Sequence, residues 1–113
     1  MTTLRNSVQL IGRPGIDPEV KTIANDRKMA RFTLATNDYY FNNKGERVEE
    51  TQWHSLVAWG KTAEIVEKLV KKGKEIMIEG KLVYNNWEDK DGLKHLQVEI
   101  VINELLSLEK ASE

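Results

Sequence analysis

The sequence predicts an all-β domain with one helix, a five-stranded Greek-key barrel in which the helix follows the third long strand. Three observations lead to this fold class. Apolar and polar residues alternate along several separate segments, as they do in strands buried on one face. A single segment, residues 61–72, has apolar residues at helical spacing. The chain has 113 residues, 40% of them hydrophobic, which suits one domain with a modest core, predicted over residues 1–108.

The segments that alternate before the helix are separated by Pro, Gly or Asn, residues that end strands. They are residues 8–12, 19–23 (a short strand), 28–36 and 51–59. Ala30, Phe32 and Leu34 share one face of the second long strand, and the residues between them share the other. Residues 37–50 are polar and predict a long, projecting hairpin loop between the last two strands.

The helix is predicted over residues 61–72, with Gly73 suited to its C-cap. Its apolar face comprises Ala63, Val66, Leu69 and Val70. Residues 75–87 predict the fourth long strand, with a bulge at Gly80, and residues 93–106 predict the last. Three long strands, one helix and two further strands are the order of the OB-fold, a small Greek-key barrel.

The third long strand carries two tryptophans on one face. Strand parity places Trp53, Ser55, Val57 and Trp59 together, opposite His54, Leu56 and Ala58. Either face could line the barrel, so this strand alone leaves open whether the tryptophans are core residues or an exposed pair. If they are exposed, they lie about 20 Å apart, at roughly 3.3 Å per residue, and would contact different nucleotides.

The fourth strand favours exposed aromatics. Ile76, Ile78 and Leu82 share its core face, whereas Trp87 has the opposite parity. Tyr39, Tyr40 and Phe41 lie on the polar hairpin, where little core is within reach. Basic residues interleave with these aromatics: Arg31, Lys61, Lys72 and Lys81. Aromatic rings and cations in one groove are the ingredients of single-strand binding, because every base has a π-face.

Several segments together resemble one family over residues 4–106. They are residues 8–12 (VQLIG), 17–20 (DPEV), 32–36 (FTLAT), 50–54 (ETQWH), 59–61 (WGK), 72–73 (KG) and 78–82 (IEGKL), followed by Trp87. With these the chain is similar to the bacterial single-stranded DNA-binding proteins. The resemblance implies an OB-fold homotetramer, cytoplasmic and nucleoid-associated, that wraps single-stranded DNA in replication, recombination and repair.

The resemblance also implies roles for particular residues. It implies base stacking by Tyr40, Trp53, Trp59 and Trp87. It implies phosphate contacts by Lys61 and Lys72, to which the interleaving adds Arg31 and Lys81.

Two features depart from the family. Residues 83–86 (VYNN) are neutral where relatives are often basic, which predicts weaker phosphate neutralisation there. Residues 109–113 form a short extension without the family's linker and acidic tip. We expect either a truncated chain or a short member of the family that does not recruit replication and repair proteins by that route. An alternative function is therefore a primosome or replisome adaptor of the same fold, which binds proteins as much as DNA.

Other functions find little support. Gly60-Lys61-Thr62 mimics the end of a phosphate-binding loop, but Ser55 stands where that motif requires Gly. There is no Cys, and His54 and His95 are the only histidines, so we expect no metal, no cofactor and no enzyme activity. No apolar run approaches a membrane span. The net charge of −1 argues against a nucleic-acid binder unless acids and bases occupy different faces.

Overall fold

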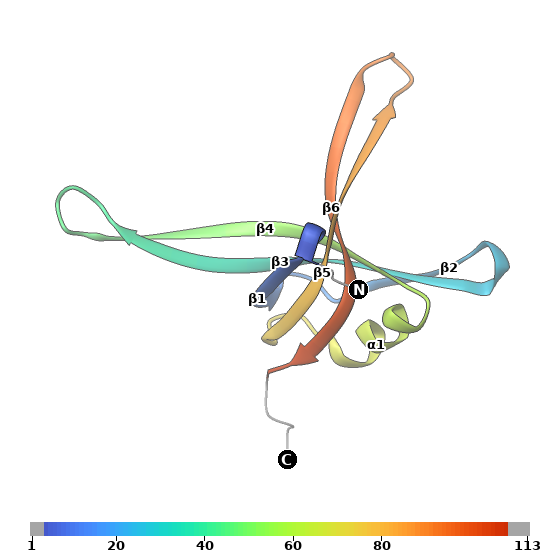
Figure 1. The fold of residues 1–113 in the computed structure, drawn as a ribbon, viewed down its shortest axis with the longest axis horizontal. Helices are drawn as coiled ribbons and strands as arrows, with labels where there is room; N and C mark the ends of the chain where they lie inside the picture. The colour runs from blue at the N-terminus through green and yellow to red at the C-terminus, as the bar shows by residue number, and fades with distance from the viewer. Residues whose placement is uncertain (1–3, 109–113) are drawn as a thin grey trace.

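Alternating polarity produces long strands that pair into one sheet in the computed structural model, which describes residues 4–108 (Figure 1). The strands are β1 (Val8–Pro14), β2 (Glu19–Ile23), β3 (Arg27–Phe41), β4 (Arg47–Trp59), β5 (Ile76–Glu88) and β6 (Lys94–Ser107). The helix α1 (Lys61–Leu69) follows β4, and short 3-10 turns occupy Leu4–Asn6 and Ala24–Asp26. The predicted extension at 109–113 lies outside the described residues.

The sheet closes on itself. Its strand order is β1-β5-β6-β4-β3-β2, and an additional pairing of β1 with β3 completes the ring. The β4–β6 pairing is parallel, with Leu56 opposite Ile100, and the other pairings are antiparallel. Because β2 pairs only with β3, the closed barrel has five strands, which confirms the predicted OB-fold class.

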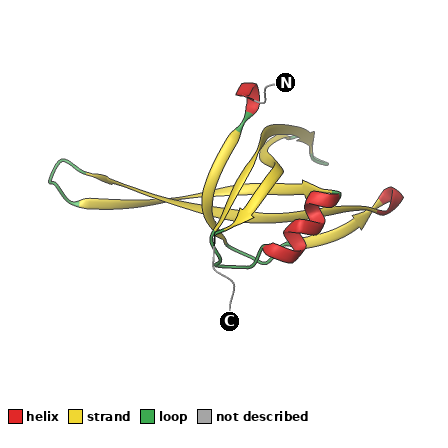
Figure 2. Ribbon diagram, turned by 60° about the horizontal axis from the view of Figure 1, so that its bottom comes forward, coloured by secondary structure: helices red, strands yellow, loops and turns green. Residues whose placement is uncertain are grey.

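The core fills the barrel from alternate positions of each strand, as strand periodicity requires. The buried residues include the predicted Ile76 and Ile78, together with Ala30, Phe32, Leu34, Leu56, Ala58, Ile100 and Ile102. Helix α1 adds Ala63 and Val66, and it packs against β3, β4 and β6 (Figure 2).

The helix is shorter than the sequence predicts, because it ends at Leu69. Val70 already has extended backbone angles, φ −88° and ψ 124°, and its N–H donates to the carbonyl of Val66. That change of direction buries Val70 completely and leaves Leu69 43% exposed. The C-cap is therefore Val70 and not Gly73, which has φ +81° in the turn that follows.

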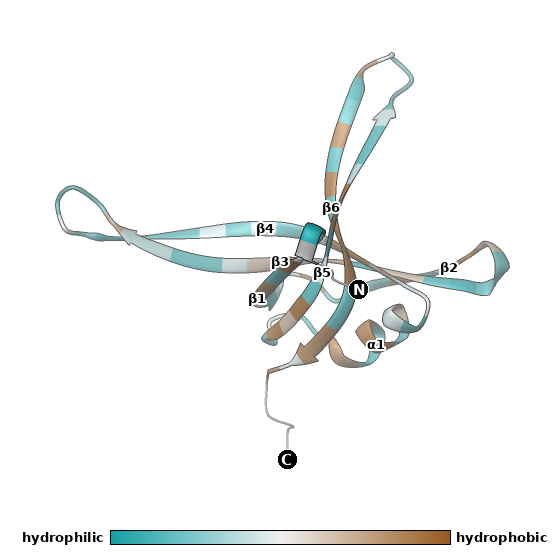
Figure 3. Cartoon of the chain, viewed as in Figure 1, coloured by the Kyte–Doolittle hydropathy of each residue, from teal (hydrophilic) through white to brown (hydrophobic). Residues whose placement is uncertain are grey.

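Two hairpins extend far beyond the core, from the β3–β4 pair and from the β5–β6 pair (Figure 1). The Cα radius of gyration is 16.5 Å, against about 13 Å for a compact chain of this length. Figure 3 shows that these arms are mostly hydrophilic, whereas apolar residues gather at the barrel. The arms are held by cross-strand pairing, and the side chains on them have no core to enter.

The predicted irregularity at Gly80 is confirmed. The β5–β6 register shifts between Glu79 and Gly80. A methyl group added at Gly80 would collide with the carbonyl oxygen of Val101, so the close approach of the two strands there requires glycine.

Candidate functional site

Exposed aromatic side chains are the main chemical feature outside the core. Trp53 is 62% exposed, Trp87 51% and Tyr40 48%, whereas Trp59 is half-buried. Leu56 and Ala58, on the other parity of β4, are buried. Val57, on the tryptophan face, is also buried, but only Leu56 and Ala58 belong to the core cluster. The alternative that the sequence left open is thereby decided: the tryptophan face of β4 is the outer face.

The indole of Trp53 rests on the chain at Gly15. Trp53 lies on β4 opposite Ala35 of β3, and the Gly15 N–H donates to the carbonyl of Thr33 at 3.0 Å. A methyl group added at Gly15 would lie 2.5 Å from Cζ3 and 2.9 Å from Cη2 of the indole. The absence of a side chain at Gly15 therefore sets where this ring can lie.

Trp59, at the other end of the same strand face, has a cation over its ring. The guanidinium carbon of Arg27 lies 4.5 Å from the ring centroid, close enough for a cation–π interaction. Arg27 therefore covers one face of the indole, which leaves Trp59 less ring surface than Trp53 has.

Trp87 forms a two-ring stack near the tip of the β5–β6 arm. Its cross-strand partner is His95, and the rings are 4.2 Å apart at 18°. The His95 Nε2 atom lies 2.8 Å from Oδ2 of Asp89, and this hydrogen bond, with one from the backbone N–H of Leu93, lowers the pKa of Asp89. The other carboxylate oxygen, Oδ1, accepts backbone N–H groups of Asp91 and Leu93, so one side chain ties the turn to the stack. Sequence reasoning gave His95 no such role, because the turn predicted at residues 89–92 places Lys94, not His95, opposite Trp87.

The β3–β4 arm carries aromatics on both faces. Tyr39 and Phe41 pack edge to face at 6.0 Å, and the guanidinium carbon of Arg47 lies 4.2 Å from the Tyr39 centroid. These two rings share the parity of Ala35, the residue paired with Trp53, whereas Tyr40 has the opposite parity. All three rings, Tyr39, Tyr40 and Phe41, are exposed. Tyr39 and Phe41 lie on the face of the arm that continues from Trp53, and Tyr40 lies on the other face.

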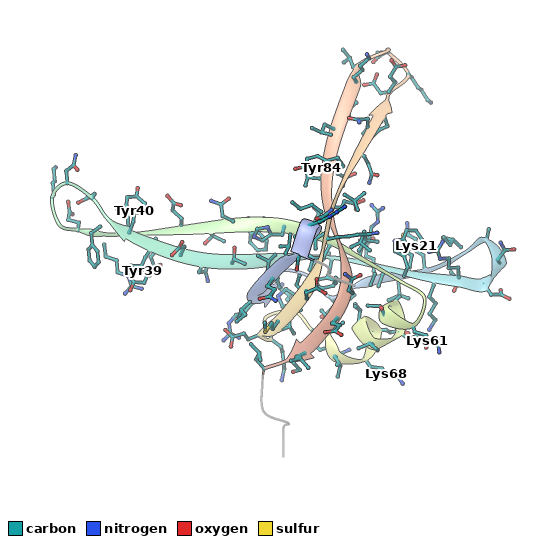
Figure 4. All side chains as sticks on the ribbon, viewed as in Figure 1. Lys21, Tyr39, Tyr40, Lys61, Lys68 and Tyr84 are labelled. Carbon is teal, nitrogen blue, oxygen red and sulfur yellow. The ribbon has the colours of Figure 1, made fainter. Side chains whose placement is uncertain are left out.

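The predicted cations are spread over the barrel. Lys61 is exposed at the first residue of α1, Lys72 is exposed after the helix, and Lys81 is exposed on β5. Figure 4 shows Lys61 on the helix and Tyr40 on the β3–β4 arm, on opposite sides of the barrel. Arg31 differs from the lysines because its Nη1 atom lies 3.3 Å from Oε2 of Glu99.

His54, the other histidine, belongs to the barrel wall. Its Nε2 atom lies 2.9 Å from Oγ1 of Thr36, and partial burial lowers its pKa. Within residues 4–108 there is no group of three or more His, Asp or Glu side chains that could hold a metal ion. In the same part of the chain, no helix has both the length and the apolar character that crossing a membrane would need.

Comparisons with known proteins agree with this geometry. The model of the single-strand binding protein family matches residues 5–108. Single-stranded DNA-binding protein 1 of Chlorobaculum tepidum is 41% identical over 104 residues, which cover 91% of this chain and 64% of the relative. The single-stranded DNA-binding protein of Neisseria meningitidis serogroup A is 38% identical over 103 residues, 91% of this chain and 59% of the relative. The chain thus spans about three fifths of the length of these relatives.

A solved structure of the Plasmodium falciparum SSB complex with ssDNA superposes with a TM-score of 0.85 at 29% identity. The match covers 92% of this chain and 95% of that one. The likeness therefore extends over nearly the whole of both chains.

Proposed function

The chain belongs to the single-strand binding protein family, and on that premise we propose that it binds single-stranded DNA without reading its sequence. The observation that carries the proposal is the exposure of Trp53 and Trp87 on outer strand faces, each with its ring held by a neighbour, Gly15 or His95. Stacking one base on such a ring contributes about 1–3 kcal/mol and tolerates any base.

The bound strand would run over the outer face of the barrel and along the arms. We assign stacking to Tyr40, Trp53, Trp59 and Trp87, with Trp59 the weakest because Arg27 covers part of its ring. Exposed Lys61, Lys72 and Lys81 would contact phosphates. Such binding would protect single strands during replication, recombination and repair. It requires no catalytic group, so added Mg²⁺ should not lead to cleavage of a labelled single strand.

The decisive experiment is a titration with poly-dT read by intrinsic tryptophan fluorescence at two salt concentrations. Stacking should quench the fluorescence, and Trp53→Ala should weaken binding by about 1–3 kcal/mol while the protein stays folded. Trp59→Ala is the matched control, because this indole is half-buried and partly covered, so its effect on affinity should be smaller. Absence of quenching by wild-type protein at low salt would refute the proposal.

We also propose that copies of this chain assemble, as a tetramer, through the outer face of β1, β5 and β6. Ile11, Met77 and Leu106 are in register across these strands, and Ile11 and Leu106 are more than half exposed. An apolar stripe of this kind marks an interaction surface. Light scattering should give a tetramer for wild type and smaller species for Leu106→Glu; a monomeric wild type would contradict the assignment.

A further inference from the structure

A hollow of about 190 Å³ lies on the outer face of the barrel, and its charge is the opposite of what a phosphate site needs. Ser55 of its lining lies two residues from Trp53 on the same face of β4. The charged side chains that line it are one cation, Arg31, and two acids, Glu19 and Glu99. The hollow is therefore net negative in the middle of the proposed DNA-binding face.

Glu99 is a buried carboxylate with both oxygens engaged. Its side chain is 5% exposed, and its Oε2 atom lies 3.3 Å from Nη1 of Arg31. Its Oε1 atom accepts a hydrogen bond from Nδ2 of Asn85 at 2.7 Å. Glu19 adds a second acid beside Arg31, because the two residues are cross-strand partners on β2 and β3.

Moving Arg31 away from this pair would be unfavourable. A buried carboxylate that loses its cation keeps its desolvation cost without compensation. If Arg31 stays where it is, a phosphate that contacts its guanidinium also comes close to two carboxylates. The phosphate and the carboxylates are all negatively charged and repel one another. The Arg31 side chain is 45% exposed, so it lies at the surface, but Glu99 already balances its charge.

We propose that Glu99, assisted by Glu19, withholds Arg31 from the phosphates of bound DNA. The proposal rests on the proposed single-strand binding and refines it. Arg31 neutralises the acids that line the hollow and is not a phosphate ligand. Removing the negative charge of Glu99 then releases a cation, so a single neutralising substitution should strengthen DNA binding.

The test is the dependence of the dissociation constant for oligo-dT on salt concentration. Each phosphate contact to a single strand contributes about 0.7 to the slope of log affinity against log salt. Arg31→Gln should leave the wild-type slope unchanged. Glu99→Gln, which can still accept the Asn85 hydrogen bond, should steepen the slope by about 0.7 for each protomer that the oligonucleotide contacts, and the double variant should return to the wild-type value.

Glu64→Gln is the matched control, because it makes the same charge change at an exposed position of α1, outside the hollow and outside the proposed assembly face, and it should not alter the slope. A slope that falls by about 0.7 for each contacted protomer in Arg31→Gln, or stays unchanged in folded Glu99→Gln, overturns the proposal. Arg31→Gln leaves the buried Glu99 carboxylate without its cation; if this variant does not fold, the slope of Glu99→Gln alone decides. If Glu99→Gln does not fold, the slope of Arg31→Gln decides. Failure of wild-type protein to bind oligo-dT would instead overturn the proposed function.

Discussion

Gly15→Ala should impair DNA binding without unfolding the protein. The added methyl group would lie 2.5 Å from Cζ3 of Trp53 and 3.0 Å from Oγ1 of Thr33. Carbon atoms in contact prefer separations of about 3.5–4.0 Å, so the indole must move by roughly an ångström or turn away. Because the ring is 62% exposed, it can do so with little effect on the core.

The loss of affinity is bounded by what Trp53 contributes. If the displaced ring no longer stacks a base, Gly15→Ala costs up to the full stacking term of about 1–3 kcal/mol. That range corresponds to a dissociation constant raised about 5- to 150-fold. The substitution should change the free energy of unfolding by less than it changes the free energy of DNA binding, because the ring moves on the surface and no cavity forms in the core.

The assay is fluorescence anisotropy of labelled oligo-dT, combined with a double-mutant cycle. Gly15→Ala should add nothing to the affinity already lost in Trp53→Ala, because both act through the same ring. A background with Trp59→Phe and Trp87→Phe makes Trp53 the only tryptophan, and its emission should shift when Gly15 is replaced. Additive effects on affinity, or unchanged emission, would refute the argument that Gly15 positions the indole.

Three further predictions concern the barrel and the second arm. Gly80→Ala should lower the free energy of unfolding in urea by about 1–3 kcal/mol, because the methyl group meets the backbone carbonyl of Val101, which cannot move aside; an unchanged urea midpoint would contradict this. Burial holds the pKa of His54 below its usual 6.5, so the imidazole takes up a proton more readily in the unfolded chain than in the folded one. The free energy of unfolding should therefore be highest above pH 6.5 and should decrease as the pH falls below 6.5. The urea midpoint at mildly acidic pH should fall less in His54→Gln, and equal falls would count against the assignment. His95→Ala removes the ring stacked on Trp87 and should weaken oligo-dT binding, whereas His95→Phe should largely restore it; equal affinities for both variants would show that stacking by this ring is irrelevant.

Strand parity and turn chemistry predict much of this molecule because both act over neighbouring residues. Alternation identifies Ile76 and Ile78 as core, and the lone glycine in a strand pattern marks the bulge at Gly80. The helix end is different. Helical spacing places Leu69 on the buried face, but the chain turns at Val70 because that residue fills the core. Tertiary packing there overrides a local signal.

The pattern cannot show where the barrel stops. Leu96 and Val98 have the same parity as Ile100, yet they are 62% and 43% exposed because β6 is still part of the arm there and enters the barrel only further along. Pairs formed by distant strands are equally hidden, since Arg31 and Glu99 are 68 positions apart in the chain and meet only after closure. Arg31, which the sequence predicts as a phosphate ligand, is thus the cation whose charge Glu99 already balances.

This pairing sets the balance of forces in binding. With Arg31 withheld, Lys61, Lys72 and Lys81 remain as proposed phosphate ligands, so each protomer that contacts DNA contributes about 2 to the slope of log affinity against log salt. For each such protomer, a rise from about 50 to 200 mM salt weakens binding by roughly 20-fold, or about 2 kcal/mol. Stacking on Tyr40, Trp53 and Trp87 of the same protomer, at about 1–3 kcal/mol each, exceeds that loss. Binding by this chain should therefore survive salt concentrations that release proteins dependent on many phosphate contacts.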